Sequence, residues 1–95
     1  MIEYLYNAIK ATAGRDIELA AKVTNESGKV VNEQCHLMLM DESGDLITRA
    51  TGNLIDGVWQ FTIPAAVTAD KQGRFWYCIC GEEQNYCFKQ PIYLV

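Results

Sequence analysis

The region from Gly57 to Val95 contains three segments rich in aromatic and β-branched residues, at 58–63, 74–80 and 87–95. Such residues fit the pleated, half-buried surface of a β-sheet. Glycine and polar residues separate the segments, as they do where a chain reverses between strands. No catalytic constellation lies on or between them. This region therefore specifies a β-sheet scaffold and does not by itself indicate a chemistry.

Segments of the same kind recur along the whole chain. Residues 17–24 alternate apolar and polar side chains, and Trp59, Phe61 and Ile63 form a second apolar row. Two such rows facing each other make the core of a sandwich. We therefore predict an all-β fold, an antiparallel β-sandwich of about seven strands. The predicted strands lie near 2–12, 17–24, 35–40, 46–51, 58–63, 74–80 and 87–94. The predicted core residues are Ile17, Leu19, Ala21, Val23, Trp59, Phe61 and Ile63.

Two segments depart from simple strand patterns. Residues 64–70 begin with a proline and continue with small residues, which predicts a short helical crossover. In 2–12, apolar residues also match the spacing of an amphipathic helix. We favour a strand there because of its tyrosine and isoleucine content and because Gly14 follows.

Size and charge limit the functions open to this chain. Its 95 residues make one domain, 1–95, and the net charge is −4 with a pI near 4.8. The eight basic residues are scattered singly, which argues against nucleic acid or an anionic membrane as a partner. The N-terminal residues lack the features of a signal peptide, and no long apolar run is present. We expect a protein made in the cytoplasm, without a membrane segment.

The cysteines and the single histidine are the residues that could bind a metal: Cys35, His36, Cys78, Cys80 and Cys87. Structural zinc sites use cysteines two to four residues apart, whereas Cys78 and Cys80 are separated by one residue on an extended segment. We therefore predict no metal, no cofactor and mostly free thiols. A hairpin turning at 83–84 would also place Cys80 opposite Cys87, where a disulfide is geometrically possible.

No residue pattern predicts an enzyme. His36 adjoins Cys35, and neighbours on a strand point to opposite faces, so the two do not form a nucleophile and base pair. The acidic residues of 41–45 and 81–85 fall in predicted turns, where they serve turn formation and solvation. We expect no catalytic residues.

Aromatic residues in the last two predicted strands are the better indication of function. They are the predicted interface residues: Trp76, Tyr77, Tyr86, Phe88 and Tyr93. Exposed apolar patches mark interfaces, and Tyr and Trp dominate their energetics. The alternative is that Phe75, Tyr77 and Ile79 face inward. The largely apolar segment 2–6 and the uncharged segment 91–95 also predict open sheet edges through which the chain would associate.

Several segments resemble known domains. Residues 14–31, 37–47 and 73–79 resemble bacterial immunoglobulin-like domains, in which an alternating strand ends at a glycine-containing turn. Residues 6–9, 56–64 and 88–95 resemble small immunoglobulin-like proteins encoded among virion and tail genes of phages and prophages of Firmicutes. The chain lacks two antibody features, because no cysteine lies in 16–24 and position 76 is Trp where the tyrosine corner would need Tyr.

The resemblance implies an immunoglobulin-like β-sandwich with a structural role. It implies a virion or tail-associated component that acts through protein contacts, by self-association or by docking on a larger phage assembly. The alternative is a small carbohydrate-binding module, in which Trp76, Tyr77 and Tyr86 would form a sugar-stacking platform.

Overall fold

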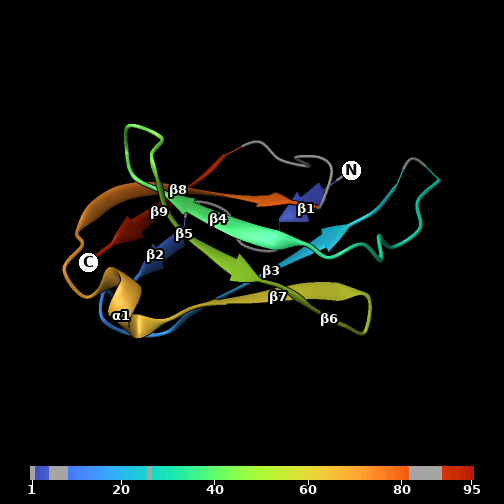
Figure 1. Cartoon of the computed structure of the whole chain (residues 1–95), viewed down its shortest axis with the longest axis horizontal. Helices are drawn as coiled ribbons and strands as arrows, with labels where there is room; N and C mark the ends of the chain where they lie inside the picture. The colour runs from blue at the N-terminus through green and yellow to red at the C-terminus, as the bar shows by residue number, and fades with distance from the viewer. Residues whose placement is uncertain (1, 5–8, 26, 82–88) are drawn as a thin grey trace.

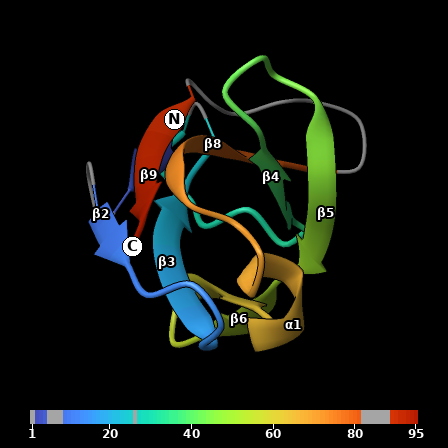
Figure 2. The ribbon, with the colours of Figure 1, turned by 90° about the vertical axis from the view of Figure 1, so that its left-hand side faces the viewer.

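A computed structural model describes residues 2–4, 9–25, 27–81 and 89–95, with the side chains of 2–4 and 9 left aside. Its strands form two packed sheets (Figures 1 and 2). The four-stranded sheet has the order β1 (Ile2–Tyr4), β3 (Ile17–Val23), β7 (Val58–Ile63) and β6 (Asn53–Ile55). The five-stranded sheet has the order β2 (Ile9–Ala11), β9 (Gln90–Leu94), β8 (Gly73–Cys80), β4 (His36–Met40) and β5 (Leu46–Thr51).

The core lies between the facing sides of the two sheets. All seven predicted core residues are buried. The prediction that their two rows face each other was wrong, because β3 and β7 are neighbours in one sheet, with Ile17 beside Ile63, Leu19 beside Phe61 and Ala21 beside Trp59. The five-stranded sheet contributes apolar rows from β4, β8 and β9. The burial of these aliphatic and aromatic side chains is the main term that stabilises the sandwich.

The segment predicted as one strand at 2–12 contains two strands, which belong to different sheets. β1 pairs antiparallel with β3, whereas β2 pairs parallel with β9. The prediction of strand rather than helix is confirmed for 2–4 and 9–11. The prediction of purely antiparallel sheets was wrong at the β2–β9 pair. β1 belongs to the four-stranded sheet and β2 to the five-stranded sheet, where β2 lies beside β9 and runs in the same direction.

The described residues form nine strands rather than about seven. Besides the division of 2–12, the sequence did not predict β6, whose three residues are all exposed and carry no alternation. β6 follows β5 directly, and Gly52 is the buried residue at which the chain crosses between the sheets. Its N–H donates to the Cys35 carbonyl at 2.9 Å, and Gln34 Nε2 donates to the Gly52 carbonyl at 2.8 Å.

The predicted helical crossover is confirmed as the short helix α1 (Ala65–Thr68), which lies at one end of the sandwich (Figure 2). The Asp16 carboxylate, just before β3, accepts from the N–H of Ala65 at 2.8 Å. Thr68 is fully buried, and its Oγ1 accepts from the N–H of Gly14 at 3.1 Å. These two contacts fix α1 against the turn that leads into β3.

Two turns, at 25–29 and 41–45, share the same hydrogen-bond pattern. In the first, Asn25 Oδ1 accepts from the N–H groups of Ser27 and Lys29 and from the Ser27 hydroxyl. In the second, Asp41 Oδ1 accepts from the corresponding groups of residues 43 and 45. A glycine with a φ of 82° or 95° occupies the fourth position, where the left-handed conformation favours glycine. The residues that accept these hydrogen bonds differ in charge, because Asp41 is ionisable and Asn25 is not.

Asp41→Asn is therefore expected to flatten the acid limb of the stability profile. Hydrogen bonds, first from the Ser43 side chain and then from the Asp45 N–H, lower the pKa of Asp41 below 3.8. A group with a lowered folded pKa stabilises the fold above its unfolded pKa, and this contribution is lost as pH falls through the folded value. Urea unfolding at pH 7 and pH 3 should show a smaller difference in unfolding free energy for Asp41→Asn than for the wild type. The reciprocal Asn25→Asp should enlarge that difference, and an unchanged difference in both variants would contradict this account.

Candidate interaction surface

The five predicted interface residues do not lie on one surface. Trp76 is half-buried on the outer face of the five-stranded sheet, whereas Tyr77 is only 1% exposed and lies in the core. Tyr86 and Phe88 lie outside the described residues. The prediction of Tyr77 as a surface residue was wrong, because consecutive residues of a strand point to opposite faces. The inward set Phe75, Tyr77 and Ile79, left open by the sequence, is the one observed.

Tyr93 shares the outer face with Trp76. It is 37% exposed and pairs with Arg74 across β8 and β9. The expectation that residues 91–95 form an open sheet edge was wrong, because β9 lies between β2 and β8. The strand at 2–4 is an edge of the four-stranded sheet, as expected.

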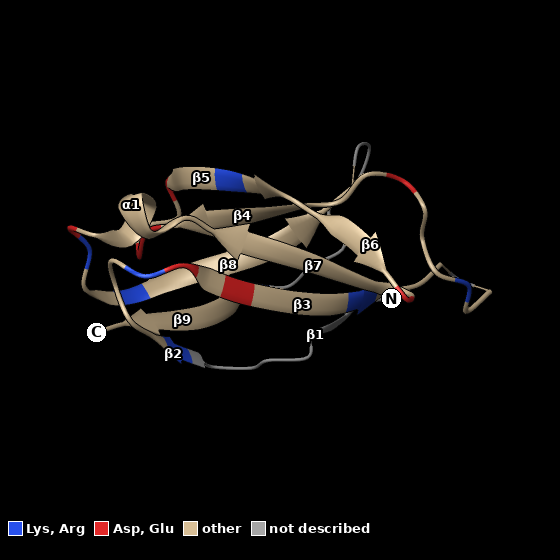
Figure 3. Cartoon of the chain, turned by 90° about the horizontal axis from the view of Figure 1, so that it is seen from below, with Lys and Arg blue, Asp and Glu red and all other residues tan. Residues whose placement is uncertain are grey.

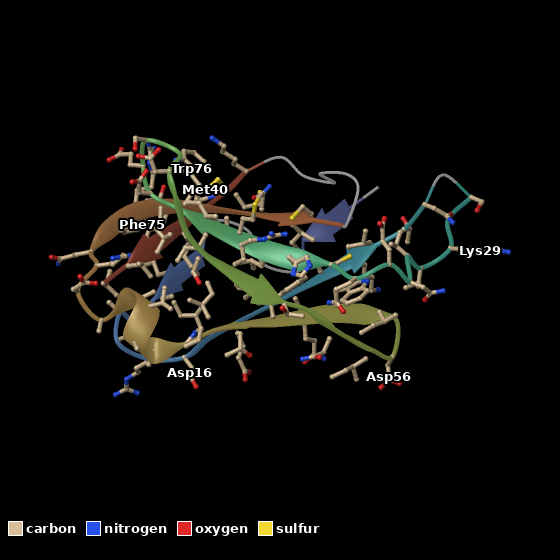
Figure 4. The ribbon with its side chains drawn as sticks, viewed as in Figure 1. Asp16, Lys29, Met40, Asp56, Phe75 and Trp76 are labelled. Atoms are coloured by element: carbon tan, nitrogen blue, oxygen red, sulfur yellow. The ribbon has the colours of Figure 1, made fainter. Side chains whose placement is uncertain are left out.

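An apolar row crosses the outer face of the five-stranded sheet. Strand pairing places Leu46 beside Met40, Met40 beside Trp76, and Trp76 beside Pro91. Leu46 is 55% exposed, and Trp76 and Pro91 are half-buried. Figure 4 shows the side chains of Met40 and Trp76 next to each other. The row thus extends over four neighbouring strands of the sheet.

Sulfur-containing side chains extend this row along β4 and β8. Met38 pairs with Cys78, and His36 pairs with Cys80, on the same face as Met40 and Trp76. Met40, Cys78 and Cys80 are at most 7% exposed, yet they do not belong to the core cluster between the sheets. This second apolar cluster, on the face that an antiparallel sandwich normally leaves to water, is the feature that most distinguishes the molecule. We call Met38, Met40, Leu46, Trp76, Cys78, Pro91 and Tyr93 the outer patch; Met40 and Cys78 are buried, and the other five are its accessible members.

The outer face of the four-stranded sheet has a different composition. Glu18 pairs with Thr62 and Ala20 with Gln60, so the centre of this face is mostly polar, while Ile55, 48% exposed, and half-buried Val58 form an apolar pair at its β6 edge. A shallow depression of about 400 Å³ lies on this face, with Ile55 among its lining residues. The polar composition is the one expected of a solvated sheet face. The outer face of the four-stranded sheet therefore serves as a comparison for the outer patch within the same molecule.

Charged residues also differ between the two outer faces. On the strands of the five-stranded sheet, the described charged side chains are Lys10, Arg49 and Arg74, whereas β3 carries both signs (Figure 3). The Arg74 guanidinium lies over the Trp76 ring at 5.0 Å from its centre and donates to Glu42 Oε1 at 3.1 Å. Glu42 is in the turn between β4 and β5, outside the strands. The charged side chains on the strands around the outer patch are therefore basic, whereas the carboxylates of Asp41, Glu42 and Asp45 lie in the turn at one end of the apolar row.

The cysteines do not form a metal site in the part of the chain that the structure describes, where no group of three or more His, Cys, Asp or Glu residues could hold an ion. Cys35, Cys78 and Cys80 are buried, Cys35 and Cys80 are free thiols, and Cys87 lies outside the described residues. Burial, with smaller contributions from Glu33 and Cys80, raises the pKa of Cys35 to about 11. Its thiol therefore stays protonated at neutral pH and is a poor nucleophile.

The native protein should accordingly react slowly with thiol reagents. We expect titration of the unfolded, unreduced chain to count at least two free thiols, while Cys35, Cys78 and Cys80 resist modification in the folded state at pH 7. The same titration includes Cys87, and a count of four thiols would show that no cysteine of the chain is bridged. Rapid modification of all three in the native state, two disulfides, or stoichiometric zinc in the purified protein would contradict this description.

Sequence reasoning missed most of the outer patch. It identified Trp76 and Tyr93 but not Met38, Met40 or Leu46. The signal was present in 37–40 and 75–80, which are apolar without interruption. In an antiparallel sheet, such runs indicate that both faces are covered by apolar groups.

The proposed sugar-stacking platform is not formed by the residues named for it. Trp76 and Tyr77 lie on opposite faces of the sheet, and Tyr86 is outside the described residues. Stacking on a sugar requires aromatic rings exposed on a common surface. Among the described aromatic residues, Trp76 and Tyr93 share the outer face.

The described helix is too short to cross a membrane. No family model matches the sequence, and no curated protein matches it significantly. The fold is similar to the Lin-41 filamin domain, with a TM-score of 0.71 and 10% identity over 99% of this chain and 91% of that one.

Domains of the E. coli α2-macroglobulin are also similar. The native form gives a TM-score of 0.69 at 15% identity and the trypsin-activated form 0.70 at 14%. The match covers 96% and 98% of this chain, respectively, and 6% of each macroglobulin chain. At these identities the likeness concerns the fold alone. The chain is an all-β protein with an immunoglobulin-like β-sandwich fold.

Proposed function

We propose that this protein is a non-enzymatic interaction module that binds another protein through the outer patch. The observation that carries the proposal is the contrast between the two outer faces. One is mostly polar, with a single apolar pair, Ile55 and Val58, at its edge, and the other has an apolar row across four strands that is rich in sulfur and aromatic groups. Soluble proteins rarely present a contiguous apolar surface unless it serves an interaction.

The composition of the outer patch supports protein binding. Trp, Tyr and Met are enriched at protein interfaces, and Arg is the charged residue most common there. Trp76 lies in the middle of the apolar row, with Met40 on one side and Pro91 on the other. A half-buried ring in such a position presents apolar area without losing much side-chain entropy on binding.

The biological setting that we propose is a phage or prophage virion, with the chain as a structural or tail-associated component. This setting rests on the resemblance of 6–9, 56–64 and 88–95 to small immunoglobulin-like proteins of Firmicutes phages. In such an assembly, the outer patch would contact a neighbouring subunit. Flanking tail or capsid genes would support this setting, and an unrelated gene neighbourhood would count against it.

Selection of binding peptides from a random library tests the interaction function. The folded wild type, Trp76→Ser and Val58→Ser would be immobilised and compared. Val58 is the matched control, because it is a half-buried apolar residue on the outer face of the other sheet. We expect the wild type and Val58→Ser to enrich the same peptides and Trp76→Ser to lose them, with all three giving β-type circular dichroism spectra.

Two outcomes would contradict the proposed function. In one, no peptide is enriched and light scattering shows a monomer at high concentration. In the other, enriched peptides bind Trp76→Ser as well as the wild type but lose affinity for Val58→Ser. The second outcome would assign binding to the polar face.

A further inference from the structure

We propose that the partner of the outer patch is a protein segment with carboxylates placed around an apolar centre. This inference rests on the proposed function and adds the chemistry of the ligand. It follows from three observations on the described residues: the sign of the charges on this face, the geometry of Arg74, and the apolar row between the arginines.

The charged side chains on the strands of this face have one sign, and the nearby carboxylates lie in the turn 41–45. The chain as a whole carries −4, yet the described charged residues on the strands of this sheet are the cations Lys10, Arg49 and Arg74. In the four-stranded sheet, by contrast, β3 carries both Glu18 and Lys22 on its outer face. Complementary charges at the rim of an interface increase association rates and select partners. Cations on the strands of an acidic protein therefore favour a partner with carboxylates that reach those strands.

Arg49 and Arg74 lie on opposite sides of the apolar row. Arg49 pairs with Met38 from the edge strand β5, and Arg74 precedes Trp76 on the central strand β8 by two residues. An extended segment crossing the patch would meet an arginine, then apolar side chains, then the second arginine. Acidic and apolar residues in alternation satisfy this order.

Arg74 is already arranged to bind a carboxylate. The Trp76 ring supports one side of its guanidinium, and Glu42 Oε1 accepts from Nη2 at 3.1 Å. The Glu42 side chain is 68% exposed, so this is a surface ion pair that contributes little to stability. A carboxylate of the partner can replace Glu42 at small cost. Glu42 thus occupies the position that we assign to the ligand.

Two other partners fit the patch less well. A second copy joined face to face would place the strand cations of both copies in one interface, where like charges are unfavourable. Nucleic acid binding relies on many phosphate contacts from clustered basic residues. Three cations on a protein of charge −4 do not supply them.

Binding of fluorescein-labelled octapeptides, followed by anisotropy, tests the inference. The probes alternate leucine with glutamate, with serine or with lysine. We expect the leucine–glutamate peptide to bind most tightly, with affinity that falls as salt increases. Arg49→Gln and Arg74→Gln should each weaken it by about two- to five-fold, as for an exposed charge pair. Glu42→Gln, which removes the competing carboxylate, should strengthen binding by a similar factor.

Lys22→Gln is the matched control, because it removes a cation from the other outer face and should leave the affinity unchanged. Equal binding of the three peptides, or tighter binding of the leucine–lysine peptide, would overturn the inference. So would tighter binding of an eight-nucleotide oligothymidylate, or dimerisation that masks Trp76. If library peptides still depend on Trp76 but are not acidic, the inference fails while the interaction function stands.

Discussion

Trp59→Ala is expected to remove most of the stability of this domain. The Trp59 side chain is 3% exposed in the core, and its indole N–H donates to the Val31 carbonyl at 3.1 Å. Truncating a buried tryptophan costs about 3–5 kcal/mol, a large share of the roughly 5–15 kcal/mol that stabilises a typical domain. Urea unfolding monitored by circular dichroism should show a strongly lowered midpoint, or no folded baseline.

Trp59→Phe separates packing from hydrogen bonding. The smaller ring retains part of the buried area but leaves the part-buried Val31 carbonyl without its indole donor, which costs at most about 1–3 kcal/mol. We therefore expect Trp59→Phe to lie between the wild type and Trp59→Ala. An alanine variant that unfolds at the wild-type midpoint would show that the inward face of β7 has been assigned incorrectly.

Gly52→Ala should have the second largest effect, although it adds a single methyl group. A Cβ at this position would lie 2.6 Å from Phe61 Cε1, 2.9 Å from Trp59 Cε3 and 3.0 Å from the Cys35 carbonyl oxygen. The backbone cannot shift freely, because Gly52 bonds to both Cys35 and Gln34. Overpacking of a core costs about 1–3 kcal/mol and occasionally more.

A double-mutant cycle with Phe61→Leu checks the cause of this effect. Leucine lacks the ring atom that lies nearest to the added methyl group. Gly52→Ala should therefore destabilise the Phe61→Leu variant less than the wild type, giving a measurable coupling free energy. Additive effects would contradict the proposed steric contact.

The sequence predicted the elements whose patterns are local. Alternation in β3 and β7 identified every core residue that they contribute, and the proline of 64–70 located α1. Which edge a strand joins is not local information. The C-terminal strand was predicted as an edge because it is uncharged, but β2 pairs with it from the other side. That pairing depends on a sheet change early in the chain, which no turn signal in the sequence marks.

The functional surface was predictable only in part for a similar reason. Trp76 and Tyr93 were predicted as interface residues because they are large and aromatic. Met38 and Leu46 join the same surface only because the strand order β8-β4-β5 places them beside Trp76, which the sequence does not show. Tyr77 could have faced either way on a strand that is apolar on both faces. Tyr77 lies in the core, and burial raises the pKa of its hydroxyl to about 12. Trp76 therefore faces outward, where it joins residues from the neighbouring strands.

The most direct test of the outer patch is a titration of the isotopically labelled protein with a library-selected peptide, followed by amide and indole NMR shifts. The account predicts shifts of the Trp76 indole N–H and of backbone amides in β4, β5 and β8, with the amides of β3 and β7 unchanged. Shifts confined to Glu18, Gln60 and their neighbours on the four-stranded sheet would contradict it.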